Sequence, residues 1–142
     1  MQIRLAKEEV YPKCAELHAR VVPGRDRETF LRQRIRRGRI YIAIKDNRII
    51  GFITFETNFI GCLYISLLMV DPAYRRRGVA RALVEQVAAH SKDGRLFSST
   101  EEDNEISIKM HEALGFRRSG YIENLPQPTR EVIYFKNLCL GR

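Results

Sequence analysis

Hydrophobic residues recur at helical spacing near the start of the chain. The first stripe falls three or four residues apart, at Val10, Cys14, Leu17 and Val21. That spacing predicts an amphipathic helix, in which Pro12 lies in the first turn and removes no hydrogen bond. A second helix is predicted over residues 27–37, because Phe30, Leu31 and Ile35 form one apolar face between arginines. A glycine follows each helix and is expected to end it.

Apolar runs bounded by turn residues predict seven strands. They lie at residues 2–5, 39–45, 49–56, 62–70, 95–100, 116–123 and 131–138. The run at 62–70 is apolar at nearly every position, which is typical of a strand covered on both faces. Asp46-Asn47 is expected to join the second and third strands as a hairpin turn.

Two more helices are predicted between the later strands. One begins at Val79, because Val79, Leu83 and Val87 recur at helical spacing. The other begins at an Asp or Asn cap near Asn104, and its expected apolar face is Ile106, Met110, Ala113 and Leu114. The predicted order of elements is therefore β-α-α-β-β-β-α-β-α-β-β. This order is typical of an α/β fold whose mixed sheet has antiparallel hairpins at its start and end and a parallel crossover in the middle.

The turn between the strand at 62–70 and the third helix combines several features of an anion site. Proline disfavours helix at the residue before it, so Asp71-Pro72 ends the strand. Three arginines follow at 75–77, and Gly78 precedes the helix. The start of a helix directs unpaired backbone N–H groups and the positive end of its dipole at one place, which suits a phosphate. The alternative is an ordinary strand-to-helix turn with a solvated basic surface.

Length and composition indicate a single domain over residues 1–142. No apolar run approaches the ~18 residues that a membrane span needs, and the first residues carry no signal-like apolar region. We therefore expect neither a membrane partner nor export. Three cysteines, Cys14, Cys62 and Cys139, share no metal-binding or disulfide spacing, which indicates reduced thiols in a cytoplasmic protein.

Positive charge is concentrated in the first part of the chain. The formal net charge is +8, and residues 20–39 hold eight arginines against two acids. Residues 25–39, which we call the basic patch, could bind an anion or a nucleic acid, or could form a solvated helix face. A nucleic-acid role is the weakest of these interpretations, because only Phe30 interleaves with the arginines and no known binding motif is present.

Two segments of the chain together resemble a known family. Val70-Asp71-Pro72 followed by Arg75-x-x-Gly78-x-Ala80 resembles the first motif of the GNAT superfamily, the acetyl-CoA-dependent N-acetyltransferases. Asn104, with Gly115-Phe116 at the end of the same predicted helix, resembles the helix that follows in that family. The resemblance covers nearly the whole chain. It implies a single N-acetyltransferase domain with a central, splayed mixed sheet flanked by helices.

The resemblance also implies acetyl-CoA as cofactor, with CoA as the product and no metal. Backbone groups of Leu68, Met69 and Val70 would pair with the pantetheine arm, and an N–H near Met69–Val70 would stabilise the tetrahedral oxygen. Asn104 would contact the pantetheine or the acetyl end. The pyrophosphate would lie on backbone N–H groups of Arg75, Arg76, Arg77, Gly78, Val79, Ala80 and Arg81.

The resemblance points to a general acid less directly. Where the family often has a tyrosine that protonates the leaving thiolate, this chain has His111. An imidazolium could do the same, because a free thiol has a pKa of ~8.5. The alternative is that His111 is an exposed helix residue paired with a neighbouring acid such as Glu112 or Glu105.

The general base has no single candidate. The two strand positions at which the family often has a glutamate hold Tyr64 and Ser99, which together with Ser66 would line the acceptor pocket. Glu56 and Glu101 lie near those strands and are the remaining candidates. A water relay, or an amine that arrives neutral, would make a dedicated base unnecessary.

The acceptor is expected to be an amine, either on a small molecule or on a protein. The resemblance places the acceptor pocket near the early helices, so Arg32 and Arg36 would favour an acceptor that carries a carboxylate or phosphate. A protein N-terminus, a lysine side chain, an amino acid and a polyamine all remain open, although the basic patch disfavours a polyamine. The main alternative to an enzyme is a catalytically silent module that binds acetyl-CoA or CoA as a sensor or partner. The resemblance is also compatible with a homodimer.

Overall fold

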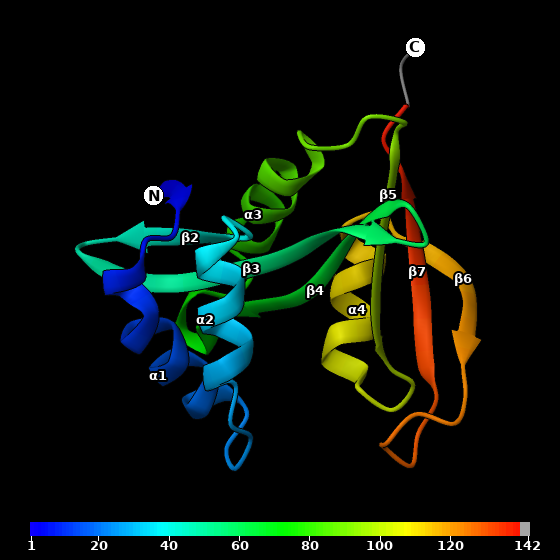
Figure 1. Ribbon diagram of the computed structural model, residues 1–142, viewed down its shortest axis with the longest axis horizontal. Coiled ribbons are helices and arrows are strands. Elements are labelled where there is room, and N and C mark those ends of the chain that lie inside the picture. The colour runs from blue at the N-terminus through cyan, green and yellow to red at the C-terminus, as the bar shows by residue number, and fades with distance from the viewer. Residues whose placement is uncertain (140–142) are drawn as a thin grey trace. The chain divides into compact units, whose positions relative to one another are not determined.

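The structure of the chain, a computed structural model, describes residues 1–139 (Figure 1). Its strands are β1 (Gln2–Leu5), β2 (Ile40–Lys45), β3 (Arg48–Phe59), β4 (Cys62–Val70), β5 (Arg95–Glu101), β6 (Arg117–Ile122) and β7 (Glu131–Asn137). Its α-helices are α1 (Tyr11–Val21), α2 (Glu28–Arg36), α3 (Val79–Ala88) and α4 (Glu105–Ala113). Single-turn 3-10 helices precede α1 and α3, at Glu8–Val10 and Pro72–Tyr74. The predicted order of strands and α-helices is confirmed.

The strands of residues 1–139 pair into one mixed seven-stranded sheet, in the order β1-β2-β3-β4-β5-β7-β6. The pairs β1–β2, β2–β3, β5–β7 and β6–β7 are antiparallel. Strands β4 and β5 run parallel with α3 in the connection between them, which is the predicted crossover. None of the helices in this part of the chain is long and apolar enough to cross a membrane.

Two strand predictions need correction. Strand β3 continues to Phe59 instead of ending at residue 56, because the turn that follows is the tight pair Ile60-Gly61, with φ angles of 51° and 77°. The prediction that β4 is covered on both faces is wrong. Its buried residues are only Leu63, Ile65 and Met69. The rest of the strand is half-exposed and includes polar side chains, which lose hydration when they are buried.

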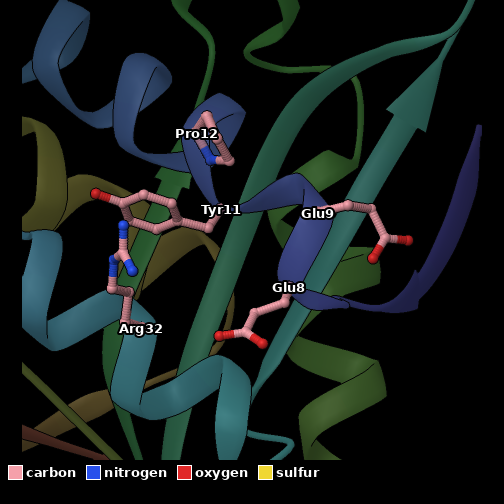
Figure 2. A pocket seen from close by; sticks show the side chains of 5 residues that line it. All are labelled: Glu8, Glu9, Tyr11, Pro12 and Arg32. Atoms are coloured by element: carbon pink, nitrogen blue, oxygen red, sulfur yellow. The ribbon is translucent and has the colours of Figure 1, made fainter.

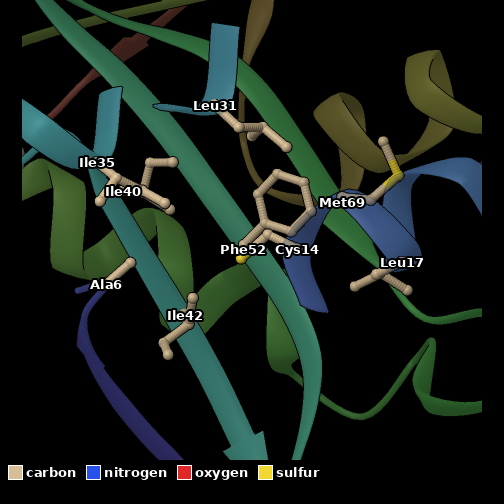
Figure 3. Packing of buried hydrophobic residues seen from close by; sticks show 9 residues of the cluster. All are labelled: Ala6, Cys14, Leu17, Leu31, Ile35, Ile40, Ile42, Phe52 and Met69. Atoms are coloured by element: carbon tan, nitrogen blue, oxygen red, sulfur yellow. The ribbon is translucent and has the colours of Figure 1, made fainter. Parts of the chain in front are cut away.

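The residues cluster into two compact units, each with its own packing. The first unit contains residues 1–56 and 67–89, and the second contains residues 57–66 and the chain from His90 onward. The core of the first unit lies between α1 and α2 on one side and β2 to β4 on the other (Figure 3). It consists of Ala6, Cys14, Leu17, Leu31, Ile35, Ile40, Ile42, Phe52 and Met69. The helical members recur at the spacing that predicted both helices.

Helix α3 packs on the other face of β3, where Gly51 makes a close approach possible. Neighbouring residues of a strand point to opposite faces, so position 51 faces away from Phe52 and the core. A Cβ on Gly51 would lie 2.9 Å from the carbonyl oxygen of Met69, 3.1 Å from Val79 Cγ1 and 3.4 Å from Leu83 Cδ1. The missing side chain therefore lets the strand backbone and α3 come into contact.

Helix α4 covers one face of the strands in the second unit. Ser98 of β5 and Tyr134 of β7 are register partners, and both are buried. His111 of α4 contacts both of them, by a hydrogen bond to Ser98 and by stacking on Tyr134. The opposite face of the same strands carries Phe97 and Phe135, whose ring centroids lie 5.2 Å apart.

The apolar face predicted for α4 is only partly right. Leu114 is buried as expected, but Ile106 is 66% exposed, Ala113 is exposed and Met110 is half-buried. His111, which the periodicity counted as polar, is buried in their place. Hydrogen bonds to both of its ring nitrogens remove the cost of burying them, so the helix turns this side chain toward the sheet.

We expect Gly51→Val to destabilise the protein by about 1–3 kcal/mol or more, as overpacking does in other cores. The added carbons have to displace the main-chain carbonyl of Met69 as well as two α3 side chains. Urea unfolding followed by circular dichroism measures the free energy of unfolding.

Ala19→Val is a suitable control, because Ala19 is an exposed residue of α1 and the change adds the same kind of side chain. It should cost no more than about 0.7 kcal/mol, the range of helix propensities. A Gly51→Val variant as stable as the parent would contradict the close packing of α3.

Candidate functional site

A buried carboxylate holds the turn between β4 and α3. Asp71 is 5% exposed, and its Oδ1 accepts a hydrogen bond from the backbone N–H of Ala73 at 3.0 Å. Its Oδ2 accepts one from Nη2 of Arg20 at 3.3 Å. The backbone N–H of Asp71 donates to the carbonyl of Ile50 in β3 at 2.8 Å, and Pro72 then begins the 3-10 turn. Asp71 therefore fixes where the strand ends and the turn begins.

The turn itself is exposed and contains two left-handed residues. Arg76 has a φ of 62°, and Gly78 has a φ of 81°. Gly78 is the N-cap of α3, so no cap side chain binds the first N–H groups of the helix, which belong to Val79, Ala80 and Arg81. These N–H groups, the helix dipole and the exposed guanidinium groups at 75–77 are features of an anion site. The predicted phosphate-binding residues thus lie together on one turn and the helix start that follows it.

The end of β4 holds the residues predicted to bind the pantetheine arm. Leu68 and Val70 are half-exposed, and Met69 is buried in the core of the first unit. All three have the extended backbone of a strand, with which another extended chain can form main-chain hydrogen bonds.

Asn104 begins α4, as predicted. Its Oδ1 accepts a hydrogen bond from the backbone N–H of Ser107 at 3.1 Å, which makes it the helix cap. The side chain is exposed, and its NH₂ group is the end that can donate to a ligand.

His111 lies in the core of the second unit and is 3% exposed. Its Nδ1 lies 2.7 Å from the carbonyl oxygen of Ser107, and its Nε2 lies 2.8 Å from Ser98 Oγ. Because a carbonyl only accepts, Nδ1 carries the proton and Nε2 accepts the proton of Ser98. The ring also stacks on Tyr134, with centroids 4.5 Å apart. Burial lowers the pKa of His111, and the hydrogen bond to the Ser107 carbonyl offsets only part of this effect.

This position corrects the expectation of an exposed His111 paired with Glu105 or Glu112. It also bears on the predicted role as general acid. An imidazole whose nitrogens are both bound, and whose pKa is lowered by burial, is neutral at pH 7 and has no free proton to give. The geometry gives His111 the part of a buried link between α4 and β5.

Tyr64 and Ser99, the positions at which the resemblance led us to look for a glutamate, contact each other. Tyr64 Oη lies 2.6 Å from Ser99 Oγ, and Ser99 Oγ donates to Oε2 of Glu131 at 2.6 Å. The other oxygen of Glu131 accepts from Nε2 of Gln127 at 3.1 Å. Ser66, the third predicted pocket residue, is half-exposed further along β4. Glu131 could not be found from the sequence, because it lies 32 residues after Ser99 and only the β5–β7 register brings the two together.

The two acids predicted as candidate bases are both engaged. Oε2 of Glu56 accepts from Nε and Nη2 of Arg34 at 2.9 Å and 2.8 Å. Oε1 of Glu101 accepts from Oγ1 of Thr129 at 2.9 Å. The Arg34 guanidinium occupies Oε2 of Glu56 with two contacts, which makes Glu56 the poorer candidate.

Two arginines of the basic patch form ion pairs with acids of the same unit. Arg32 Nη2 lies 3.3 Å from Glu28 Oε1, and Arg36 Nε lies 3.4 Å from Glu8 Oε1. The Arg32 guanidinium also stacks on the ring of Tyr11, at 4.5 Å (Figure 2). A cavity of about 240 Å³ opens there, lined by Glu8, Glu9, Tyr11, Pro12 and Arg32. It combines two carboxylates with one guanidinium and is therefore not a purely basic site.

Residues 7–116 match the family model of the GNAT acetyltransferases. The chain belongs to this family. It is similar to a GNAT-family acetyltransferase structure from Bacillus cereus, with 36% identity, 96% of each chain covered and a TM-score of 0.85. It is also similar to an acetyltransferase structure from Bacillus anthracis in complex with acetyl coenzyme A, with 28% identity, 69% of this chain and 61% of that chain covered and a TM-score of 0.62.

A curated relative of this GNAT chain is aminoglycoside N(6′)-acetyltransferase type 1 of Acinetobacter baumannii. The two are 38% identical over 79 residues, which is 51% of this chain and 45% of the relative. The match therefore spans less than half of the relative's own length. Together these comparisons confirm the predicted family and the predicted mixed-sheet fold, while the roles of individual residues stay predictions.

We expect the free energy of unfolding of this GNAT chain to decrease as the pH is lowered below neutrality. Burial lowers the pKa of His111, so below the ordinary histidine pKa of ~6.5 the unfolded chain binds a proton that the folded chain rejects. Stability is therefore complete above that pH and decreases below it, by up to ~1.4 kcal/mol per pH unit for each such histidine. His18, whose pKa is lowered by burial and by Arg27 and Arg25, acts in the same direction. Urea unfolding between about pH 5 and about pH 8 measures this decrease.

His111→Gln separates the contribution of His111, because the amide can hydrogen-bond but does not titrate. It should reduce the slope of stability against pH and leave the part due to His18. Leu114→Ala, at the other buried position at the end of α4, should lower stability equally at every pH. A His111→Gln variant with the parental slope would contradict a neutral, buried imidazole.

Proposed function

We propose that the chain transfers an acetyl group from acetyl-CoA to a primary amine, by direct attack of the amine on the thioester in a ternary complex. The exposed turn at 75–78 carries this proposal, because it combines the uncapped start of α3 with three guanidinium groups. These are the groups that bind a pyrophosphate. The acetyl coenzyme A in the Bacillus anthracis neighbour supports the choice of cofactor, with CoA as product. We further propose that residues 1–142, of which 140–142 lie outside the described residues, act as one N-acetyltransferase domain.

Residues at the end of β4 and at the start of α4 make the remaining contacts with the cofactor. The backbone of Leu68, Met69 and Val70 pairs with the pantetheine arm, and an N–H near Met69–Val70 holds the oxygen of the tetrahedral intermediate. The side-chain NH₂ of Asn104 donates to the pantetheine or the acetyl end. Most of the rate advantage comes from positioning, because an amine and a thioester are already reactive toward each other.

The acceptor is an amine on a small molecule or on a protein. The aminoglycoside acetyltransferase relative supports a small-molecule amine. We further propose that the acceptor carries a carboxylate or a phosphate, which Arg32 and Arg36 bind. To do so, Arg32 releases Glu28 and Arg36 releases Glu8, and the ligand anion takes the place of these acids. The homodimer stays a prediction, which analytical ultracentrifugation checks.

Isothermal titration with acetyl-CoA tests the cofactor site. We expect micromolar binding, weaker binding of CoA that lacks its 3′-phosphate, and no measurable binding to Gly78→Glu. The introduced carboxylate repels the pyrophosphate, and its side chain is strained at a φ of 81°. Gly24→Glu is the matched control, because Gly24 has the same φ of 81°, lies in an exposed turn and is not among the residues proposed to bind the cofactor. A parent protein that does not bind acetyl-CoA would overturn the proposal.

Thiol release from acetyl-CoA then separates the enzyme from a silent module. The acceptors are an aminoglycoside with a 6′-amine, a peptide with a free N-terminus and a free amino acid. Release of CoA that depends on one of these amines supports the transferase. Tight binding of acetyl-CoA without release of thiol for any amine supports the catalytically silent alternative.

The anionic acceptor makes a separate prediction. Hydrogen bonds to charged groups contribute about 1.5–3 kcal/mol each, so Arg32→Glu with Arg36→Glu should raise KM at least ~10-fold for a peptide with a free carboxylate. The amide of the same peptide should change little. Arg4→Glu with Arg48→Glu, two exposed arginines outside the basic patch, matches the change in net charge. Equal changes in KM for the peptide and its amide would remove Arg32 and Arg36 from the acceptor site.

A further inference from the structure

Tyr64, Ser99 and Glu131 form a continuous chain of hydrogen bonds across β4, β5 and β7. Ser99 Oγ lies 2.6 Å from Tyr64 Oη on one side and 2.6 Å from Glu131 Oε2 on the other. A carboxylate only accepts, so the Ser99 hydroxyl donates to Glu131, and the Tyr64 hydroxyl in turn donates to Ser99. The direction in which protons can move along the chain is therefore fixed, from Tyr64 toward Glu131.

The hydrogen bonds from Tyr64 through Ser99 to Glu131 lie on the face of the strands opposite α4. Tyr64 is the register partner of Phe97, and Ser99 follows Phe97 by two positions, so the side chains of Tyr64 and Ser99 point to the same face. Ser98 points to the other face, where its hydroxyl binds His111. Tyr64, Ser99 and Glu131 are all half-exposed, so ligands and solvent can reach them.

Neutral donors hold the Glu131 carboxylate. One oxygen accepts from the Ser99 hydroxyl and the other from the Gln127 amide, at 2.6 Å and 3.1 Å. Glu56, by contrast, accepts from the guanidinium of Arg34 at 2.8 Å. A cationic partner stabilises a carboxylate against protonation more strongly than neutral donors do. Of these two acids, Glu131 is the one that the Ser99 hydroxyl connects to Tyr64, so it is the better placed proton acceptor.

Aromatic packing fixes the Tyr64 ring independently of its hydroxyl group. The ring stacks on Phe59, with centroids 4.3 Å apart and an interplanar angle of 14°. The ring of Phe59 in turn packs against that of Phe97, with centroids 5.9 Å apart. Removing the hydroxyl in Tyr64→Phe therefore leaves the packing of the ring in place.

We propose that this hydrogen-bonded chain is the general-base relay of the acetyl transfer, in which Tyr64 contacts the attacking amine and Glu131 is the final proton acceptor. The inference rests on the proposed N-acetyltransferase function. The base is thus a carboxylate two hydroxyl groups away from the amine, carried by β7. Tyr64 is the catalytic residue of the relay, while Ser99 and Glu131 act through it.

Each turnover moves one proton from the amine to Glu131. The neutral amine attacks the thioester carbon, so that a C–N bond forms and the nitrogen becomes strongly acidic. Tyr64 Oη takes the N–H proton and passes its own proton to Ser99 Oγ, which passes its proton to Glu131. The C–S bond breaks, and CoA leaves as a thiolate. Glu131 then returns its proton to water, and the thiolate takes a proton from water, so the net products are an amide and CoA thiol.

Steady-state thiol release tests the relay, with acetyl-CoA and the amine that gives the fastest release in the acceptor screen. We expect Glu131→Gln to lower kcat at least ~10²-fold, the lower range for general-base catalysis, and to leave KM for acetyl-CoA unchanged within about 2-fold. The glutamine oxygen can still accept from Ser99, and the Gln127 amide then turns its own oxygen toward the new NH₂ group. Glu102→Gln is the matched control, because Oε2 of Glu102 accepts from the backbone N–H of Arg130 at 2.7 Å where β5 ends and β7 begins. This variant should keep the parental kcat.

Two further measurements separate a relay from a structural network. The double variant Tyr64→Phe with Glu131→Gln should be no slower than the slower single variant, because a relay that is already broken is not broken again. Ser99→Ala interrupts the same chain without touching either end and should lower kcat to a similar extent. The urea midpoint of each variant confirms that it is folded.

The outcomes separate the relay from the proposed function. A parent that transfers acetyl groups and a Glu131→Gln variant that is equally fast would overturn the relay alone. Multiplicative losses in the double variant would also overturn it, because they indicate independent roles. A parent that binds acetyl-CoA but releases no thiol with any amine would overturn the transferase activity and the relay with it.

Discussion

The close approach of backbone to backbone at Gly51 is the constraint on which the proposed cofactor turn depends. Position 51 has no room for a Cβ between the Met69 carbonyl and α3. The residue before it, Ile50, accepts the hydrogen bond from the N–H of Asp71. Two adjacent residues of β3 thus hold both ends of the turn, the end of β4 and the start of α3 at Val79. A loop held at both ends can keep left-handed residues in an exposed place, where the N–H groups of a helix start face an anion.

The features that could be predicted from the sequence are those with local causes. Asp71-Pro72 ends a strand and Gly78 begins a helix because of preferences that act within one or two residues. The cap at Asn104 is equally local. The end of β3 could not be predicted, because its turn uses Ile60 at a φ of 51°, a conformation that β-branched residues rarely adopt. Gly61 marks the turn, but no residue preference marks Ile60 as its first position.

The features that could not be predicted depend on partners distant in sequence. Periodicity treats His111 as polar and assigns α4 a face that includes Ile106, yet Ile106 is exposed and His111 is buried. A histidine whose nitrogens are both satisfied packs like an apolar ring, and its partner Ser98 is supplied by another strand. Glu131 was missed for the same reason, because its place beside Ser99 follows only from the pairing of β5 with β7.

The pairing of β5 with β7 therefore links the fold to the proposed chemistry. Ser98 and Ser99 are adjacent and chemically identical, but the pleat points one toward α4 and the other toward Glu131. A slip of one residue in this register would exchange the two faces, so that the hydroxyl now bound to His111 would take the place of the hydroxyl in the relay. The buried contacts of Ser98 oppose such a slip. The contact between the buried His111 and Ser98 thus helps to fix the strand that presents Ser99 to Tyr64 on its opposite face.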